Sequence, residues 1–274
     1  MAKIRLKQSA IRKLLLLADA VLLAAFLIAS FFLVRSLIER RMSRTLYEEA
    51  AAMAVSTPEP ATPTPDETPA PSAPPTRRTA PEVPIEVDFE KLATESRYIR
   101  GWLYSAGTPI NYPLVQRDNN EFYLTHSYQG SKRVSGAIFF DCRNAADLSD
   151  QNLILYGHHM ADDSMFGTLL NYVYADDYYG NHPIMYLITP MQDYRIELFA
   201  ARSMNSDPVN YPVWFASEEE HRTFINRAIK NSEISADTEV ADGAQAIMLV
   251  TCTYTGTVSD KKFILYGELV PLGV

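Results

Sequence analysis

Cysteine is scarce in this sequence, because only Cys142 and Cys252 occur among its 274 residues. Two thiols close at most one disulfide, and they would do so in an oxidising compartment. The chain does not depend on such a bond, since apolar residues make up 47% of the sequence and can build a core unaided. A free thiol available for chemistry is therefore our main interpretation, and a Cys142–Cys252 disulfide is the alternative.

Basic charge is lacking over most of the chain. Lys and Arg number 25 against 33 Asp and Glu, and nine of the basic but only four of the acidic residues fall within positions 1–54. The remaining 220 positions thus hold 16 basic and 29 acidic residues. Nucleic-acid binding requires a basic surface, so nucleic acid is not an expected partner.

Charge is almost absent between residues 14 and 34, where LLLLADAVLLAAFLIASFFLV contains Asp19 alone. A helix of this length crosses the hydrocarbon core of a bilayer. Residues 1–13 carry five Lys and Arg and no acid, so the positive-inside rule predicts a cytoplasmic N-terminus and an external remainder. A cleaved signal peptide is the alternative, although the run is long for one and no small-x-small cleavage site closes it before Arg35.

Composition predicts three further regions after this anchor. Residues 35–54 favour helix by intrinsic propensity and extend the anchor outward. Residues 55–84 are rich in proline, which fixes φ and removes backbone donors, so an extended and largely disordered spacer is expected. Residues 85–274 are expected to form the folded domain.

Short apolar segments rich in β-branched and aromatic residues, separated by turn residues, predict that this domain is mainly β, a barrel or a sandwich. The expected strands are 137–141, 152–159, 183–188, 193–203, 244–254 and 261–270. Two helices interrupt them. Asp88 is a suitable N-cap for a short helix ending near Tyr98. Ser217 and Glu220 form a capping box before an apolar stripe that ends near Asn231.

Two strand ends carry residues suited to chemistry. The apolar strand LILYGHH ends in His158 and His159, and LVTCTY contains Cys252. A strand end holds a side chain rigidly while leaving it open to substrate. A thiol needs a nearby imidazole to become a thiolate or to protonate a leaving amine. Each residue alone is more often structural, but together they form a candidate Cys–His dyad whose contact in space the sequence leaves open.

Several segments in a fixed order resemble class B sortases over about residues 87–270. The first is GWLYSAGTPINYPLVQRDNNEFYLTHSYQG, followed by SGAIFFDCRN, LILYGHHMADDSMFGTL, the helix at 217–230 and LVTCTY. The matching residues of the first segment are Gly101, Trp102, Asn111, Tyr112, Pro113, Gln116, Asp118, Asn119, Tyr123 and Leu124. The resemblance implies a closed sortase-type β-barrel with an N-terminal helix and one long helix before the cysteine strand, preceded by a transmembrane helix.

The resemblance also implies roles for individual residues. Cys252 matches the nucleophile and His158 the acid/base. Lys262 stands where the family has an arginine that binds substrate and steadies the oxyanion, and a compact ammonium lacks the planar donor fork of a guanidinium. The candidate substrate-binding residues are Thr251, Tyr254 and His159. No cofactor and no metal is expected.

The implied reaction is acyl transfer at the cell membrane, by a single-pass protein whose catalytic domain is extracellular. The expected partners are secreted proteins with a C-terminal Asn-Pro-x-Thr-like sorting motif, which Cys252 cleaves through a thioester, and an acceptor amine of a cell-wall precursor or pilin. Hydrolysis of the same thioester would make the protein a cysteine peptidase. Lys262 and Met248, which replaces a threonine usual in the family, leave a weak or inactive peptide-binding module as the other alternative.

Overall fold

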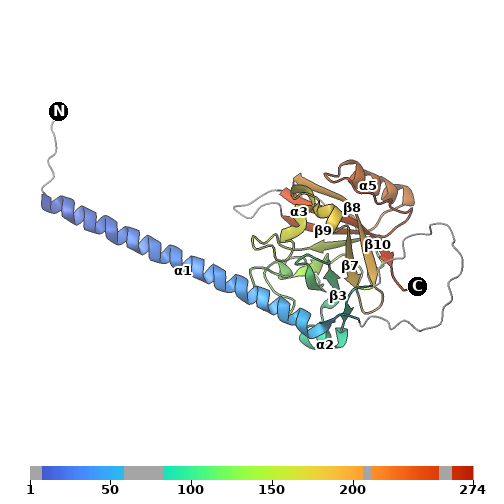
Figure 1. Cartoon of the computed structure of the whole chain (residues 1–274), viewed down its shortest axis with the longest axis horizontal. Coiled ribbons are helices and arrows are strands. Elements are labelled where there is room, and N and C mark those ends of the chain that lie inside the picture. Colours follow the sequence, from blue (N-terminus) through green and yellow to red (C-terminus); the bar gives the residue numbers. More distant parts are fainter. Residues whose placement is uncertain (1–7, 59–82, 206–210, 253–260, 274) are drawn as a thin grey trace, which may run out of the picture. The chain divides into compact units, whose positions relative to one another are not determined.

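The structure is a computed structural model that describes residues 8–58, 83–205, 211–252 and 261–273 (Figure 1). The chain divides into two compact units, Met1–Thr45 and Leu46–Val274.

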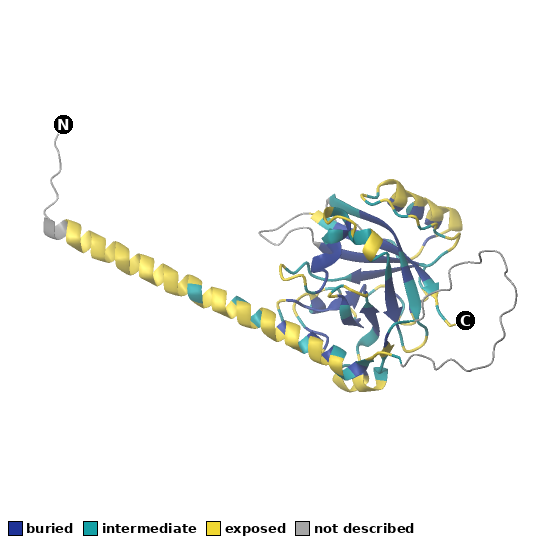
Figure 2. Cartoon of the chain, viewed as in Figure 1, coloured by how far each residue is buried: buried dark blue, intermediate teal, exposed yellow. Residues whose placement is uncertain are grey.

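The first unit consists of most of helix α1, which spans Gln8–Ala54. Within the described residues, one helix is long and apolar enough to cross a membrane, Ile11–Ala54, and its most apolar 18-residue window has a mean hydropathy of 2.5 and is 0% buried. Figure 2 shows this exposure along the helix. The apolar N-terminal helix is consistent with the membrane anchor expected over residues 14–34.

The second unit contains a closed barrel in which the strands follow the order β10-β8-β7-β3-β4-β5-β6-β9. The strands are β3 Ile99–Tyr104, β4 Asn111–Val115, β5 Ile138–Phe140, β6 Asn152–Tyr156, β7 Ile184–Ile188, β8 Tyr194–Asn205, β9 Ala246–Cys252 and β10 Lys261–Pro271. The β4–β5 and β6–β9 pairs are parallel, and the other pairs are antiparallel. The expected mainly β closed barrel is therefore confirmed.

Strands β6, β9 and β10 are buried on both faces, which explains why their sequences are continuously apolar. In β9, Ile247 and Leu249 belong to the main core, whereas Met248 and Val250 belong to a second cluster. Side chains of a strand alternate between its two faces, so these two sets lie on opposite sides of the sheet. The second cluster includes Ile225 and other residues of helix α5, which spans Glu218–Lys230.

Both predicted helix starts are confirmed. Asp88 caps α2, Phe89–Glu95, by accepting from Lys91 N at 3.0 Å, and α2 ends three residues before the expected Tyr98. Ser217 caps α5 by accepting from Glu220 N at 3.1 Å. The remaining helical segments are short, namely η1 Phe122–Leu124, η2 Gly167–Leu170, α3 Asn171–Tyr174 and α4 Tyr178–Asn181.

The compact unit begins at Leu46, earlier than the boundary at residue 85 drawn from composition. Tyr47 and Ala50, near the end of α1, are buried, and strand β1 (Val55–Ser56) pairs with β2 (Glu86–Val87). The first and last residues of the expected 55–84 spacer thus belong to or adjoin the folded unit. Positions 59–82 of that spacer lie outside the described residues.

Candidate active site

The parallel pairing of β6 and β9 brings the two candidate catalytic positions to the same end of the barrel. The register pairs Tyr156 with Val250. The hydrogen bond from Gly157 N to Val250 O, 3.2 Å long, belongs to this last pair. His158 and Cys252 each lie two residues past this pair, His158 beyond the end of β6 and Cys252 as the last residue of β9. The structure describes the backbone of Cys252, and its thiol lies outside the described atoms.

Lys262 occupies the position directly opposite Cys252 on the other neighbouring strand, β10. Paired residues of antiparallel strands have Cα atoms about 4.5–5.5 Å apart and lie on the same face of the sheet. Lys262 is half-buried. The structure therefore pairs the backbone positions of Cys252 and Lys262, with His158 two residues beyond the end of the neighbouring strand β6.

The His158 ring is held by a backbone carbonyl. Its Nε2 lies 2.7 Å from the carbonyl oxygen of Leu124, at the end of η1. A carbonyl oxygen only accepts hydrogen bonds, so the proton of this bond belongs to Nε2. Nδ1 is then the nitrogen that takes up or releases a proton. This carbonyl gave no signal in the sequence, because any residue at position 124 would supply one.

The backbone around His158 depends on a glycine. A Cβ at Gly157 would lie 2.6 Å from the ring of Phe166, so a larger residue would displace that ring. Phe166 N also donates to the carbonyl oxygen of His158 at 3.0 Å. These two contacts close the loop after β6 back onto His158 and fix its main chain.

His159 differs from its neighbour in environment. It forms an isolated β-bridge with Met165, whose N donates to Tyr112 Oη at 3.0 Å. Its Nδ1 is buried, with no hydrogen-bond partner among the described residues. Burial lowers the pKa of His159, despite the nearby Asp163 carboxylate, which acts in the opposite direction. A neutral ring suits a packing role better than an acid/base role.

Of the other two predicted substrate-binding residues, the structure describes Thr251 and not Tyr254. Thr251 is 2% exposed, and its Oγ1 has no hydrogen-bond partner among the residues that the structure describes. It follows the alternation of Ile247 and Leu249, which belong to the barrel core. Tyr254 lies outside the described residues. Substrate binding by Thr251, Tyr254 and His159 stays a prediction.

Met248, the second departure from the family pattern, is a core residue. It is buried in the cluster beneath α5, and its Sδ accepts from Asn152 Nδ2 at 3.2 Å. Asn152 begins β6 and pairs with Ala246, at the opposite end of β9 from Cys252. Met248 therefore packs the sheet four residues before Cys252 in β9.

Cys142 carries a free thiol, so the alternative Cys142–Cys252 disulfide is not formed. Its backbone N donates to Asn120 Oδ1 at 2.7 Å. Burial and the adjacent Asp141 carboxylate raise the pKa of the Cys142 thiol. A thiol with a raised pKa is a poor nucleophile near neutral pH.

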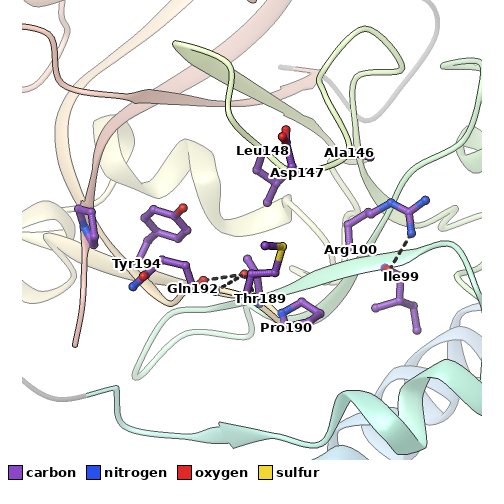
Figure 3. Close-up of a pocket in the computed structure, with 11 residues that line it drawn as sticks. Ile99, Arg100, Ala146, Asp147, Leu148, Thr189, Pro190, Gln192 and Tyr194 are labelled. Carbon is purple, nitrogen blue, oxygen red and sulfur yellow. Dashed lines mark hydrogen bonds between the residues drawn. The ribbon is translucent and has the colours of Figure 1, made fainter. Parts of the chain in front are cut away.

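A pocket of about 610 Å³ lies at the other end of the barrel (Figure 3). Its walls include Arg100 at the start of β3, Leu148, Gln192 in the β7–β8 turn, and Pro271, the last residue of β10. Strand β10 runs from Lys261 to Pro271, so about 30 Å of strand separates this pocket from the paired positions. The pocket is therefore separate from the candidate active site.

Comparison with known proteins gives a consistent result. No protein-family model matches the chain. Sortase B of Listeria monocytogenes is 30% identical over 183 residues, which cover 67% of this chain and 73% of the relative. The crystal structure of Bacillus anthracis sortase B in complex with AAEK1 matches with a TM-score of 0.69 and 26% identity, over 86% of this chain and 99% of that one. The Staphylococcus aureus sortase B–substrate complex matches with a TM-score of 0.63 and 27% identity, over 68% and 85%.

The closed eight-stranded barrel, which matches those of the solved sortase B structures, identifies the fold as that of a sortase, a class of cysteine transpeptidases. The 30% sequence identity with the Listeria relative narrows the class from sortases in general to sortase B. The chain belongs to the sortase B family.

Proposed function

We propose that this protein cleaves a C-terminal sorting motif of secreted proteins and transfers the acyl group to an amine, with Cys252 as nucleophile and His158 as acid/base. The pairing of Cys252 with Lys262, with His158 just beyond the end of the neighbouring strand β6, is the observation that supports this proposal. Family membership supports the transpeptidase class of the reaction.

In the first half of the reaction, the Cys252 thiolate forms a bond to the carbonyl carbon of the threonine in the motif. Negative charge moves to the carbonyl oxygen, where the Lys262 ammonium stabilises it. His158 Nδ1 gives its proton to the departing amine as the peptide bond breaks, while Nε2 keeps the proton shared with Leu124 O. The products of this half-reaction are a thioester on Cys252 and a free amine.

In the second half, an acceptor amine attacks the thioester carbonyl and loses a proton to His158 Nδ1. The bond from carbon to sulfur breaks, and the thiolate leaves with the electron pair. The enzyme returns to its starting state with a new amide bond formed. The proton released in this half replaces the one spent in the first.

The proposed substrates are secreted proteins with an Asn-Pro-x-Thr-like motif, and the proposed acceptor is an amine of a cell-wall precursor or a pilin. A sortase B of the same family has been solved as a complex with substrate, which supports a peptide ligand for this chain. We further propose that Thr251 shapes the site from within the core, because its hydroxyl is buried.

We propose a single-pass membrane location with a cytoplasmic N-terminus and an external catalytic domain. The exposed apolar helix and the five basic residues before position 14 support this orientation. The Pro-rich segment within residues 55–84 would then act as a tether outside the cell.

Incubation of the full chain in detergent with a sorting-motif peptide, with and without an added amine, tests the reaction class. We expect a peptide–amine conjugate when the amine is present. A product formed only by hydrolysis would instead indicate a cysteine peptidase. Peptide binding without cleavage would indicate the inactive binding module that Lys262 and Met248 left open.

A further inference from the structure

The end of helix α1 is fixed to the barrel by Tyr47. Its side chain is 4% exposed, and its Oη donates to the carbonyl oxygen of Gly136 at 2.6 Å. Its ring packs edge-on against Tyr112, with ring centroids 5.3 Å apart and an interplanar angle of 86°. Both contacts lie within the second compact unit. Tyr47 thus joins two segments that are more than 60 residues away in the sequence.

The first contact leads to the carbonyl that holds His158. Gly136 has φ +58°, and a Cβ there would lie 2.3 Å from Tyr123 O and 3.0 Å from Leu124 O. Ala137 N also donates to Tyr123 O at 2.9 Å. The backbone at Gly136 therefore lies directly against the backbone that ends η1. A shift of Gly136 would move the Leu124 carbonyl, which accepts from His158 Nε2.

The second contact leads to the main chain that follows His158. Tyr112, whose ring packs edge-on with that of Tyr47, accepts from Met165 N through its hydroxyl oxygen at 3.0 Å. The next residue, Phe166, donates to the carbonyl oxygen of His158. The ring and the backbone of His158 are thus held by two separate sets of contacts, and both begin at Tyr47.

We propose that Tyr47 is a positioning residue for His158, acting through the Gly136 and Leu124 carbonyls on the ring and through Tyr112 on the loop. Because Nε2 stays bonded to Leu124 O, Nδ1 stays available to the reacting atoms. This inference rests on the function proposed for His158. It also makes the last turns of α1 part of the working enzyme, in addition to any role of the helix in anchoring.

Tyr172 provides a matched control, because it is also a buried tyrosine bonded to a backbone carbonyl but lies in α3 and not in α1. It is 3% exposed, and its Oη donates to the carbonyl oxygen of His182 at 2.8 Å. Replacing either tyrosine by phenylalanine removes one buried hydrogen bond to a carbonyl and keeps the ring. A purely structural role for Tyr47 predicts that the two variants behave alike.

The test measures His158 directly, without turnover. Full chains in detergent are treated with diethyl pyrocarbonate, which acylates neutral imidazole nitrogen, and the modification rate of His158 is read by peptide mass spectrometry. Fragment ions separate His158 from His159. The free energy of one hydrogen bond corresponds to a change of about threefold to tenfold in an equilibrium constant. We therefore expect the modification rate of His158 to rise by about that factor in Tyr47→Phe. In Tyr172→Phe we expect no change.

Steady-state kinetics on the same variants give the second readout. We expect kcat to fall by a similar factor in Tyr47→Phe while KM stays constant, because the orientation of His158 affects the chemical step. An unchanged labelling rate in Tyr47→Phe, or equal changes in both variants, would overturn the inference. If the wild-type chain shows no acyl transfer, the proposed function fails, while the labelling result still decides the inference.

A further variant covers the case in which Tyr47→Phe does not fold. Tyr112→Phe keeps the ring contact with Tyr47 and removes the acceptor for Met165 N. We expect faster labelling of His158 in this variant as well, by about the same factor. A wild-type labelling rate in folded Tyr112→Phe would contradict the path through the loop.

Discussion

At one end of the barrel, Cys252 ends β9 opposite Lys262 and His158 follows the end of the neighbouring strand β6, whereas at the other end the β7–β8 turn and Pro271 line a pocket of about 610 Å³. Cysteine and histidine are absent from the described lining of that pocket. The cavity and the reactive residue types thus lie about a strand length apart. This pocket is therefore distinct from the strand ends that carry the candidate catalytic residues.

The two cysteines give the sharpest test of this comparison, since only Cys252 lies at the histidine end. Cys252→Ala removes the proposed nucleophile and should abolish acyl transfer to a sorting-motif peptide. Cys142, on the loop that leads toward the pocket wall, has a free thiol with a raised pKa. Cys142→Ala should therefore keep wild-type turnover in the same peptide assay, and equal losses in the two variants would contradict the assignment.

Replacement of the two adjacent histidines by alanine should lower turnover to very different extents. His158→Ala removes the acid/base, which is worth about 10²–10⁴ in rate. His159→Ala removes a half-buried ring whose pKa is lowered by burial, so it should change kcat by less than about tenfold through local packing alone. Turnover numbers measured at pH 7 decide between them. A larger loss in His159→Ala than in His158→Ala would reverse the assignment.

Two substitutions of Lys262 distinguish an effect of its charge from an effect of its packing. If the ammonium stabilises the oxyanion, Lys262→Ala should lower kcat by about 10²-fold, the size of a lost oxyanion donor. Lys262→Arg keeps the charge and adds a planar fork, so turnover should be kept or raised. These variants are compared by kcat at saturating peptide. Loss of activity in Lys262→Arg would count against an oxyanion role.

The smallest expected effects are on the pH dependence of folding stability. His159 at one end of the barrel and Asp193 at the other should contribute to it in opposite directions. Burial lowers the pKa of His159, so its contribution to stability is present above the unfolded pKa of about 6.5 and is lost as pH falls below it. Burial raises the pKa of Asp193, in the turn beside the pocket, so its contribution is present at low pH and is lost as pH rises through the folded value.

Chemical denaturation of two variants checks these directions. Relative to wild type, His159→Gln should gain stability as pH falls from 7 to 5. Asp193→Asn should gain stability as pH rises from 4 to 7, because the amide oxygen can still accept from Thr189 N. Both differences should stay within about 1 kcal/mol. Parallel pH curves for a variant and wild type would rule out that residue's contribution.

Strands β5 to β10 were recognised in the sequence by their apolar, β-branched and aromatic residues. Strands β3 and β4 were not, because Gly101 and Pro113 interrupt their patterns. Gly101 is required by packing, since a Cβ there would lie 2.9 Å from the carbonyl oxygen of Ile188. That carbonyl is 87 positions away, so no local pattern records the constraint.

The catalytic roles of the candidate site residues stay a prediction, drawn from residue type and family resemblance. The side chains of His158, Cys252 and Lys262 carry their chemistry in the sequence, and the family resemblance placed them together. The Leu124 carbonyl could not be predicted, because every residue has a carbonyl. The hydroxyl of Tyr47 was equally hidden, because its partner lies 89 residues away and compositional analysis assigned position 47 to the segment outside the domain.

Intact-mass spectrometry of the full chain mixed with a sorting-motif peptide, in the absence of an amine, tests the central claim most directly. The account predicts an added mass equal to the acyl part of the peptide, located on Cys252 by fragmentation and absent from Cys252→Ala. His158→Ala should accumulate it much more slowly. An adduct on another residue, or cleavage of the peptide by Cys252→Ala, would contradict the account.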